Sequence, residues 1–265
     1  MTWFRKQRDS ADPPAGDDPR SEGHPQDPAE VFVVTDRVVS PFVVMVHDPA
    51  GFRAEQFRGL RNKLLAMNPD GAAKTLVITS AIKGEGKTVT AINLALAFAE
   101  LERTPILLVD ADLRSRAIEG ALGLDPAPGV ADLLMGRVGL DRAIRPAGWR
   151  NLSLLGPGSR IAGPSEVLST PRVDELFARL KERFQYVILD TPPILAATDA
   201  GVLAAQADGT VVVVRLEHSA RTHSKDAIRQ IQDLGANVLG TFVTEVRGAD
   251  PDADPRLGYP VRAEE

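Results

Sequence analysis

Two groups of residues in this sequence have the types and the spacing needed to handle a phosphate. The first is the glycine-rich run Lys83-Gly84-Glu85-Gly86-Lys87-Thr88. Glycines let backbone N–H groups approach an anion without a Cβ in the way, and the start of a following helix adds unpaired donors. Lys87 would reach the β- and γ-phosphates of a nucleotide, and the Thr88 hydroxyl would hold Mg²⁺. We therefore predict an ATP-binding loop formed by Lys83, Gly84, Glu85, Gly86, Lys87, Thr88 and Val89.

The segments on either side of this loop fit the prediction. Residues Thr75–Thr79 have strand character, and Val89–Leu101 is an amphipathic run typical of a helix. Strand, glycine loop and helix are the context that a Walker A motif requires. One position departs from the strict pattern, because Ala81 stands where a glycine is expected six residues before the lysine. The alternative is a glycine-rich connection without a ligand, but the lysine, the hydroxyl and both flanking segments favour the phosphate site.

The second group consists of carboxylates that follow apolar runs. Asp110 and Asp112 come at the end of Ile106–Val109, and Asp190 ends the run Tyr186–Leu189. In parallel α/β sheets, ligand groups lie at the carboxyl ends of the strands. Side chains at positions i and i+2 point the same way, so this pair can face Mg²⁺ or the proton of a nucleophile. Helix capping would explain only one of the two, and Asp190 fits a Walker B position.

The apolar runs also predict the fold. Near-continuous apolar strands are typical of parallel sheets that are buried on both faces. We expect an α/β fold of the P-loop NTPase class, with a doubly wound, mostly parallel sheet and helices on both faces. Further strands are expected at Leu152–Leu155, Thr210–Leu216 and Asn237–Val243, further helices at Val130–Met135, Arg172–Phe184 and Arg221–Leu234, and one added edge strand within residues 31–46. Asp199 falls in an expected loop, where a γ-phosphate sensor and a helix N-cap are equal interpretations.

The run Phe52–Ala66 predicts a helix of its own. Its apolar face consists of Phe57, Leu60, Leu64 and Leu65. Glu55, Arg58 and Arg61 recur at i, i+3 and i+6, so they share another side of the helix. From spacing alone, a solvated face with salt bridges is the better interpretation of these three residues.

Composition narrows the class of protein. The 265 residues carry a formal net charge of −5, which argues against a nucleic-acid-binding surface. There is no cysteine, so disulfides and thiolate metal sites are excluded. We find no apolar run long enough for a membrane span and no signal-peptide core, and we expect a soluble cytoplasmic protein. We predict disorder in residues 1–30, a P-loop domain over residues 31–246, and a flexible tail over residues 247–265.

With these motifs placed, residues 45–246 resemble the bacterial tyrosine kinases of capsule and exopolysaccharide systems. That family lies within the MinD/ParA-like P-loop ATPases. The resemblance is carried by the runs EQFRGLR (55–61), KGEGKT (83–88), DADLR (110–114), GPSEVLST (163–170) and LDTPP (189–193). The ParA-type signature lysine is missing, because Ile82 stands five residues before Lys87. This difference favours the kinase group over the partition ATPases.

The resemblance implies roles for the motif residues. Lys87 and Thr88 would bind ATP and Mg²⁺, and Asp112 and Asp190 would be the Mg²⁺ ligands. Asp110 would receive the proton of the acceptor tyrosine, with Lys87 and Asp112 completing the catalytic group. The resemblance also implies a ring-type homo-oligomer joined through Glu55, Arg58 and Arg61. It further implies a separate membrane-bound activator, a polysaccharide co-polymerase, that would bring the protein to the inner face of the membrane.

The sequence departs from the family pattern in its acceptor tyrosines and at a position near the adenine of ATP. The family has a cluster of tyrosines in its C-terminal tail, whereas this tail carries only Tyr259, the one candidate phosphoacceptor. The other tyrosine, Tyr186, lies in an expected buried strand. Thr244 stands where relatives often have an asparagine toward the adenine. An ATP-driven switch, or a nucleotide-binding scaffold without tyrosine kinase activity, therefore stays as the alternative. The polysaccharide system, the protein substrates and the ring size do not follow from the sequence.

Overall fold

The computed structural model describes residues 37–216, 218 and 220–245, all within one unit of the chain, Val31–Glu265. Seven strands form one sheet in the order β3-β4-β2-β5-β1-β6-β7. Their bounds are β1 Lys74–Ser80, β2 Ile106–Asp110, β3 Ile144–Trp149, β4 Leu152–Leu155, β5 Tyr186–Asp190, β6 Gly209–Arg215 and β7 Val238–Thr244. Every neighbouring pair is parallel except β3 with β4. The predicted fold class, a doubly wound and mostly parallel sheet, is confirmed.

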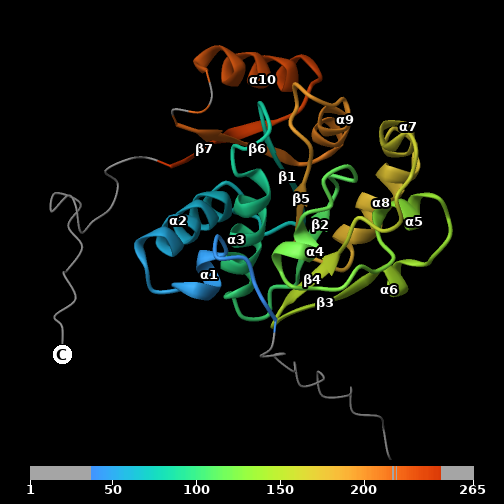
Figure 1. Cartoon of the computed structure of the whole chain (residues 1–265), viewed down its shortest axis with the longest axis horizontal. Coiled ribbons are helices and arrows are strands. Elements are labelled where there is room, and N and C mark those ends of the chain that lie inside the picture. Colours follow the sequence, from blue (N-terminus) through green and yellow to red (C-terminus); the bar gives the residue numbers. More distant parts are fainter. Residues whose placement is uncertain (1–36, 217, 219, 246–265) are drawn as a thin grey trace, which may run out of the picture. The chain divides into compact units, whose positions relative to one another are not determined.

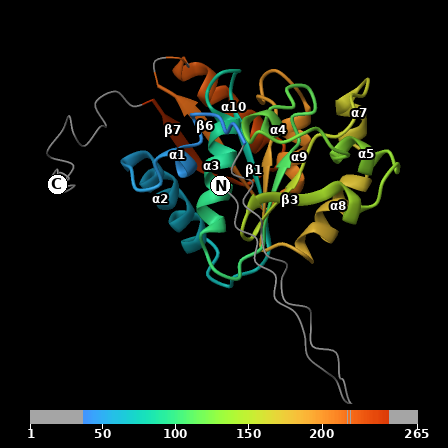
Figure 2. The same ribbon diagram turned by 60° about the horizontal axis from the view of Figure 1, so that its bottom comes forward.

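Helices cover both faces of this sheet, as expected. They are α1 Val44–His47, α2 Phe52–Ala66, α3 Lys87–Ala99, α4 Ile118–Ala121, α5 Val130–Leu134, α6 Leu140–Ala143, α7 Pro164–Leu168, α8 Arg172–Lys181, α9 Asp199–Gln206 and α10 Arg221–Asp233. Figure 1 shows α1, α2 and α3 on one side of the sheet and α8, α9 and α10 on the other. The turned view in Figure 2 shows the same separation between α2 and α8.

Two apolar clusters follow from this arrangement, one on each face of the sheet. Side chains alternate along β2, so Leu107 and Val109 join one cluster, while Ile106 and Leu108 join the other. All five residues of β2 and all five of β5 are buried. Strands buried on both faces must be apolar throughout, which explains why these runs could be recognised in the sequence.

The helix after the glycine loop is more enclosed than its pattern suggested. We expected an amphipathic helix, but every residue of α3 from Thr90 to Phe98 is buried. The sheet covers one side of α3, and α1 and α2 pack against another. Helix α3 is therefore a central element that fixes the position of Lys87 and Thr88 at its first turn.

The prediction of an edge strand within residues 31–46 is wrong for residues 37–46, the part of this range that the structure describes. Residues 37–43 form no strand there, and Val44–His47 is the short helix α1. The side chain of Asn93 explains the difference. Its Oδ1 accepts a hydrogen bond from the N–H of Met45 at 3.0 Å, and its Nδ2 donates to the carbonyl of Phe42 at 3.0 Å. A side chain of α3 thus satisfies backbone groups that would otherwise need a neighbouring strand.

Strand β3 was not expected at all. It contains Pro146 and an irregular register between Pro146 and Trp149, where it pairs antiparallel with β4. Proline has no N–H to donate and is tolerated on an edge strand. Without the alternation of a half-buried strand, this segment carried no periodic signal. Within the described residues, no helix is both long and apolar enough to cross a membrane.

Candidate active site

The glycine loop connects the carboxyl end of β1 with the first turn of α3. Gly84 and Gly86 have φ angles of 91° and 92°. These left-handed conformations are open to glycine at no steric cost. Ala81, the position that departs from the strict motif, is fully buried and belongs to the apolar cluster. A methyl group therefore fits at this position, and the departure does not disturb the loop.

The loop lysine, Lys87, forms ion pairs with two of the predicted carboxylates. Its Nζ lies 3.0 Å from Oδ2 of Asp112 and 3.9 Å from Oδ1 of Asp190. The adjacent Thr88 hydroxyl donates to Oδ2 of Asp190 at 2.7 Å. The sequence placed these residues in one site, and the structure brings them together. The direct Lys87–Asp112 ion pair was not predicted, because no local spacing encodes a contact between residues 25 positions apart.

Asp110 lies beside this group, on the strand next to β5. In the ladder between β2 and β5, Asp110 is the direct partner of Asp190. Its Oδ2 accepts a hydrogen bond from the backbone N–H of Ile118 at 3.1 Å. Its side chain is fully buried. The parallel register therefore explains how acids 80 positions apart in the sequence become neighbours.

Burial dominates the electrostatics of the carboxylates. It raises the pKa of Asp110 well above the usual range, and the nearby charge of Asp190 raises that pKa further. Burial also raises the pKa of Asp190 to about 6, although Lys87 and the Thr88 hydroxyl oppose the shift. For Lys87, burial alone would lower the pKa, but the surrounding aspartates outweigh it and raise the pKa. The lysine is charged, and it stands among more acids than it can neutralise.

Other sequence-predicted residues lie outside this group. Asp199 is the first residue of α9, with Thr198 at the N-cap position, so the N-cap interpretation of Asp199 is wrong. Its Oδ2 instead lies 3.2 Å from Nε of Arg114, which also donates to Ser165 Oγ at 2.9 Å. Arg114, in the segment after β2, thereby connects helices α7 and α9. Tyr259 lies outside the described residues.

The charged side of α2 forms an ion network within the chain. Glu100, just after α3, accepts from Nε of Arg58 at 2.9 and 3.1 Å and pairs with Arg61 at 3.1 Å. Arg58 also pairs with Glu55. Hydrogen bonding by Arg58 lowers the pKa of Glu100, so this pairing persists into mildly acidic solution. Glu100 was not singled out in the sequence, where it ends an apolar helix without any motif.

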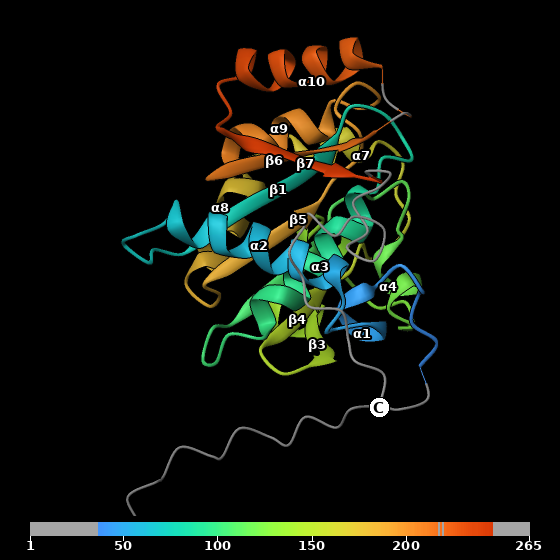
Figure 3. The ribbon, with the colours of Figure 1, turned by 90° about the vertical axis from the view of Figure 1, so that its left-hand side faces the viewer.

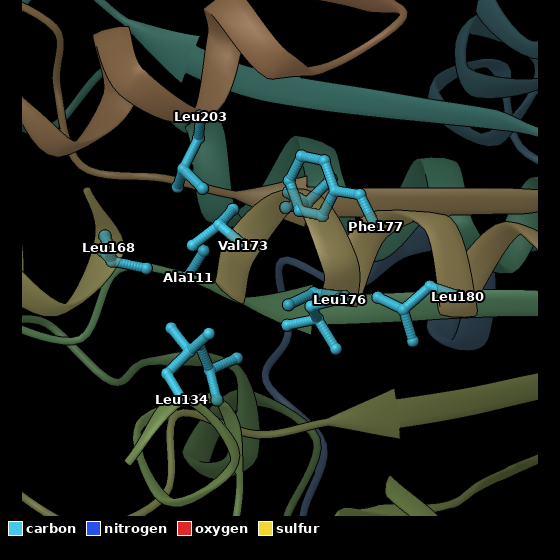
Figure 4. A pocket seen from close by; sticks show the side chains of 11 residues that line it. Ala111, Leu134, Leu168, Val173, Leu176, Phe177, Leu180 and Leu203 are labelled. Carbon is cyan, nitrogen blue, oxygen red and sulfur yellow. The ribbon is translucent and has the colours of Figure 1, made fainter. Parts of the chain in front are cut away.

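One small cavity among the described residues is lined by none of the residues of this site. It has a volume of about 10 Å³, roughly the space of one water molecule. Its lining is entirely apolar and includes Leu134, Leu176, Phe177, Leu180 and Leu203, which point toward one another in Figure 4. We interpret it as a packing gap between α8 and the sheet.

The donor set fits a magnesium ion that arrives with a nucleotide. Two buried carboxylate atoms, Oδ1 of Asp110 and Oδ1 of Asp190, have no hydrogen-bond partner. Among the described residues, no group of three histidine, cysteine or acidic side chains is arranged to hold a metal alone. Mg²⁺ is usually bound through one or two carboxylates together with phosphates and waters. The side chains present therefore suit Mg²⁺ as a companion of bound phosphates.

This fold, with a glycine loop ahead of a buried helix and acids at the neighbouring strand ends, is that of the P-loop NTPase class. A family model described as an AAA domain matches residues 73–239. YwqD, a tyrosine-protein kinase of Bacillus subtilis, is 32% identical over 201 residues, which are 76% of this chain and 84% of YwqD. The chain belongs to the family of bacterial tyrosine-protein kinases.

Solved structures agree with this assignment. The kinase domain of the Escherichia coli tyrosine kinase ETK matches with a TM-score of 0.73 at 28% identity, over 79% of this chain and 82% of that domain. MinD of Pyrococcus horikoshii, complexed with Mg-ADP, matches with a TM-score of 0.56 at 24% identity, over 64% and 70%, which shows the shared fold alone. Longer relatives are matched in part: Wzc of Salmonella typhimurium is 28% identical over 77% of this chain but only 28% of its own length.

Proposed function

We propose that this chain is an ATP-dependent protein-tyrosine kinase that phosphorylates itself between subunits. The observation that carries the proposal is the group at the strand ends, where Lys87 lies 3.0 Å from Asp112 and next to Asp190. The register partner of Asp190 is Asp110, a buried acid whose pKa is raised by burial and by the nearby charge of Asp190. Perturbed acids beside a phosphate loop are the expected signature of phosphoryl transfer.

In this proposal, residues 83–89 bind the phosphates of ATP. Backbone N–H groups of the loop and of the first turn of α3 donate hydrogen bonds to the phosphate oxygens, and Lys87 neutralises charge on the β- and γ-phosphates. In the structure that lysine is engaged by Asp112 and Asp190. Incoming phosphates would compete with these carboxylates for the ammonium group, which leaves the carboxylates available to a cation.

Thr88, Asp112 and Asp190 would hold Mg²⁺. When bound, the ion would neutralise charge on the phosphates. The Thr88 hydroxyl already lies 2.7 Å from Asp190, so two of the three groups are adjacent before any ligand binds.

Asp110 would accept the proton of the tyrosine hydroxyl. The tyrosine oxygen forms a bond to the γ-phosphorus, the bond from that phosphorus to the bridging oxygen of ADP breaks, and the proton passes to the Asp110 carboxylate. Burial raises the pKa of Asp110, which makes its ionised form a stronger base than an ordinary aspartate. Lys87 and Asp112 hold the phosphates in position relative to Asp110 during the transfer.

The cellular setting is also part of the proposal. We place Glu55, Arg58 and Arg61 at the contact between subunits of a ring, with Tyr259 as the acceptor. Relatives with names such as CapB and Wzc support a role in capsule or exopolysaccharide production. A separate membrane-bound activator would recruit the protein to the inner face of the membrane.

One observation favours a second candidate, an ATP-driven switch that lacks kinase activity. The chain has only two tyrosines. Tyr186 is buried at the start of central strand β5, where its hydroxyl lies 2.9 Å from Nδ2 of Asn68 and its ring packs on Phe98. Tyr186 has no access to another subunit, which leaves Tyr259 as the sole acceptor in the chain.

Incubation with γ-labelled ATP and Mg²⁺ separates the candidates. A kinase transfers label to tyrosine, a switch releases labelled phosphate without labelling protein, and a scaffold does neither. Label on tyrosine in the wild type and its absence in Asp110→Asn are the expected results. Phosphate release without any phosphotyrosine, on this protein or on added tyrosine polymer, would overturn the kinase assignment.

A further inference from the structure

Every backbone carbonyl group of the glycine loop from Ile82 to Gly86 accepts a hydrogen bond. Ile82 accepts a hydrogen bond from the Ser80 hydroxyl at 2.8 Å, and the carbonyl of Gly86 accepts the N–H of Thr90 at 2.8 Å. The three carbonyls between them each accept a side-chain donor. These pairs are Lys83 with His218 Nε2 at 3.2 Å, Gly84 with Arg215 at 3.2 Å, and Glu85 with the Thr244 hydroxyl at 3.1 Å.

The three side-chain donors come from one place, the carboxyl ends of the last two strands. Arg215 ends β6, His218 follows it, and Thr244 ends β7 as the ladder partner of Arg215. Figure 3 shows β6 and β7 side by side at this edge of the sheet. We call Arg215, His218 and Thr244 the carbonyl clamp. Glu245 holds the Arg215 side chain of the clamp in place, because its Oε2 accepts a hydrogen bond from Nε of Arg215 at 2.6 Å.

The clamp is packed closely against both left-handed glycines. A Cβ built on Gly84 would lie 3.3 Å from Nε2 of His218, and one built on Gly86 would lie 3.8 Å from Oγ1 of Thr244. The contacts therefore coincide with the two peptide positions that give the loop its shape.

Peptide planarity gives these contacts a consequence for anion binding. Across a trans peptide, the C=O of one residue and the N–H of the next point in opposite directions. Donors that hold the carbonyls of Lys83, Gly84 and Glu85 toward the β6–β7 edge turn the following N–H groups the other way. A concave row of N–H groups is what binds phosphate in such loops, and holding it before the ligand arrives reduces the ordering cost of binding.

We propose that Arg215, His218 and Thr244 are positioning residues for the nucleotide, which act by fixing the phosphate loop through its carbonyls. This inference rests on the proposed nucleotide site and deepens it. Removing one donor should weaken the binding of any polyphosphate that occupies the loop. The effect should fall on the affinity and the KM for ATP, while the transfer rate at saturating ATP stays close to that of the wild type.

Thr244 offers the cleanest test, because three small substitutions separate its possible roles. Thr244→Val removes the hydroxyl and keeps the shape, and Thr244→Ser keeps the hydroxyl. Thr241→Val makes the same change at an exposed position of the same strand. Titration calorimetry with Mg·ADP and with inorganic tripolyphosphate, which has no base, measures the effect of each variant. His218→Ala, at an exposed side chain, supplies a second and independent removal of a clamp donor.

We expect Thr244→Val to weaken both ligands by about fivefold, roughly the value of one net hydrogen bond. Thr244→Ser and Thr241→Val should bind like the wild type, and His218→Ala should weaken both ligands as well. Weaker Mg·ADP binding with unchanged tripolyphosphate binding would overturn the clamp in favour of a direct contact with the base. Unchanged affinity for both ligands would also overturn it. A wild type that binds neither ligand would instead refute the nucleotide site itself.

Discussion

At the scale of single residues, the site places three buried aspartates around one partly buried lysine. Asp112 contacts the ammonium group directly, whereas Asp110 is held by the backbone N–H of Ile118. Asp110 and Asp112 therefore have different neighbours, although Asp110 ends β2 and Asp112 lies only two residues later. This difference leads us to expect different consequences when each is neutralised.

Asp112→Asn should mainly weaken Mg²⁺-dependent nucleotide binding, and Asp110→Asn should mainly slow transfer, by about 10²- to 10⁴-fold for the loss of a general base. Nucleotide affinity with and without Mg²⁺, together with single-turnover transfer, measures the two effects separately. If both variants lose transfer while the Mg²⁺ dependence of binding is unaltered, this division of roles is wrong.

The raised pKa values predict how the stability of the nucleotide-free protein depends on pH. Asp190 has a pKa of about 6 in the folded protein, above the value of about 3.9 for an unperturbed aspartate. The folded state thus binds more protons than the unfolded state between about pH 4 and 6. The free energy of unfolding therefore falls as pH rises through this window, by up to about 3 kcal/mol for a pKa difference of this size. The raised pKa of Asp110 acts in the same direction.

Thermal unfolding without nucleotide should accordingly show a higher Tm at about pH 5 than at about pH 6.5. Asp190→Asn removes the titrating group and should flatten this dependence, whereas Asp226→Asn, on the exposed side of α10, should leave it unchanged. A Tm that rises from about pH 5 to about pH 6.5 in the wild type, or an equal slope in Asp190→Asn, would contradict the assigned pKa of Asp190.

At the scale of elements, α2 carries the charged group proposed as the subunit contact. In a single chain, Arg58 and Arg61 are held by Glu100, which is partly exposed. Exposed ion pairs are each worth less than about 1 kcal/mol, so these contacts are exchangeable for contacts with a neighbour. The same arginines are thus already ordered for the pairing that we propose with a second subunit.

Self-association through α2 is the expected outcome of that arrangement. Arg58→Ala/Arg61→Ala should be monomeric by light scattering under conditions in which the wild type assembles with Mg·ATP. Because the pairs are near the surface, its Tm should drop by only a few degrees. Arg53→Ala, at an exposed position of the same helix, is the matched control and should assemble normally. A wild type that stays monomeric at high concentration with nucleotide would count against the ring.

Six of the seven strands were predicted from the sequence, and the predicted ends of β1, β2, β4, β5, β6 and β7 lie within a residue of the observed ones. Strands β2 and β5 are the clearest cases, because each is an apolar run that ends in an acid. Strand β3 and helix α1 escaped because their stability depends on partners far along the chain, such as Asn93 for α1. The acids of the site were recognised from their strand ends. The ion pairs of these acids with Lys87 were not predicted, and neither was the carbonyl clamp. Both depend on the order of the strands in the sheet, which no local pattern in the sequence encodes.

At the scale of the whole molecule, phosphorylation between subunits requires a tyrosine that reaches another copy. Tyr259 is separated from the end of β7 by about fifteen residues, enough for a flexible chain to span roughly 20 Å on average. Mass spectrometry after incubation with Mg·ATP should find phosphate on Tyr259, and Tyr259→Phe should remove the phosphotyrosine signal. ATP hydrolysis with unmodified Tyr259 would instead favour a switch, or a kinase that acts only on other proteins.

The central claim is that residues 83–89 and the acids around Lys87 form a nucleotide site, and calorimetric titration with Mg·ATP tests it most directly. Lys87→Met should weaken binding by about tenfold to a hundredfold, because it removes a charged partner of the phosphates. Circular dichroism would confirm that the variant is folded, and Lys225→Met, at an exposed lysine of α10, would serve as the control. The wild type and the control should bind alike, and the Lys87 variant should lose affinity. Equal affinity in all three proteins would contradict the site.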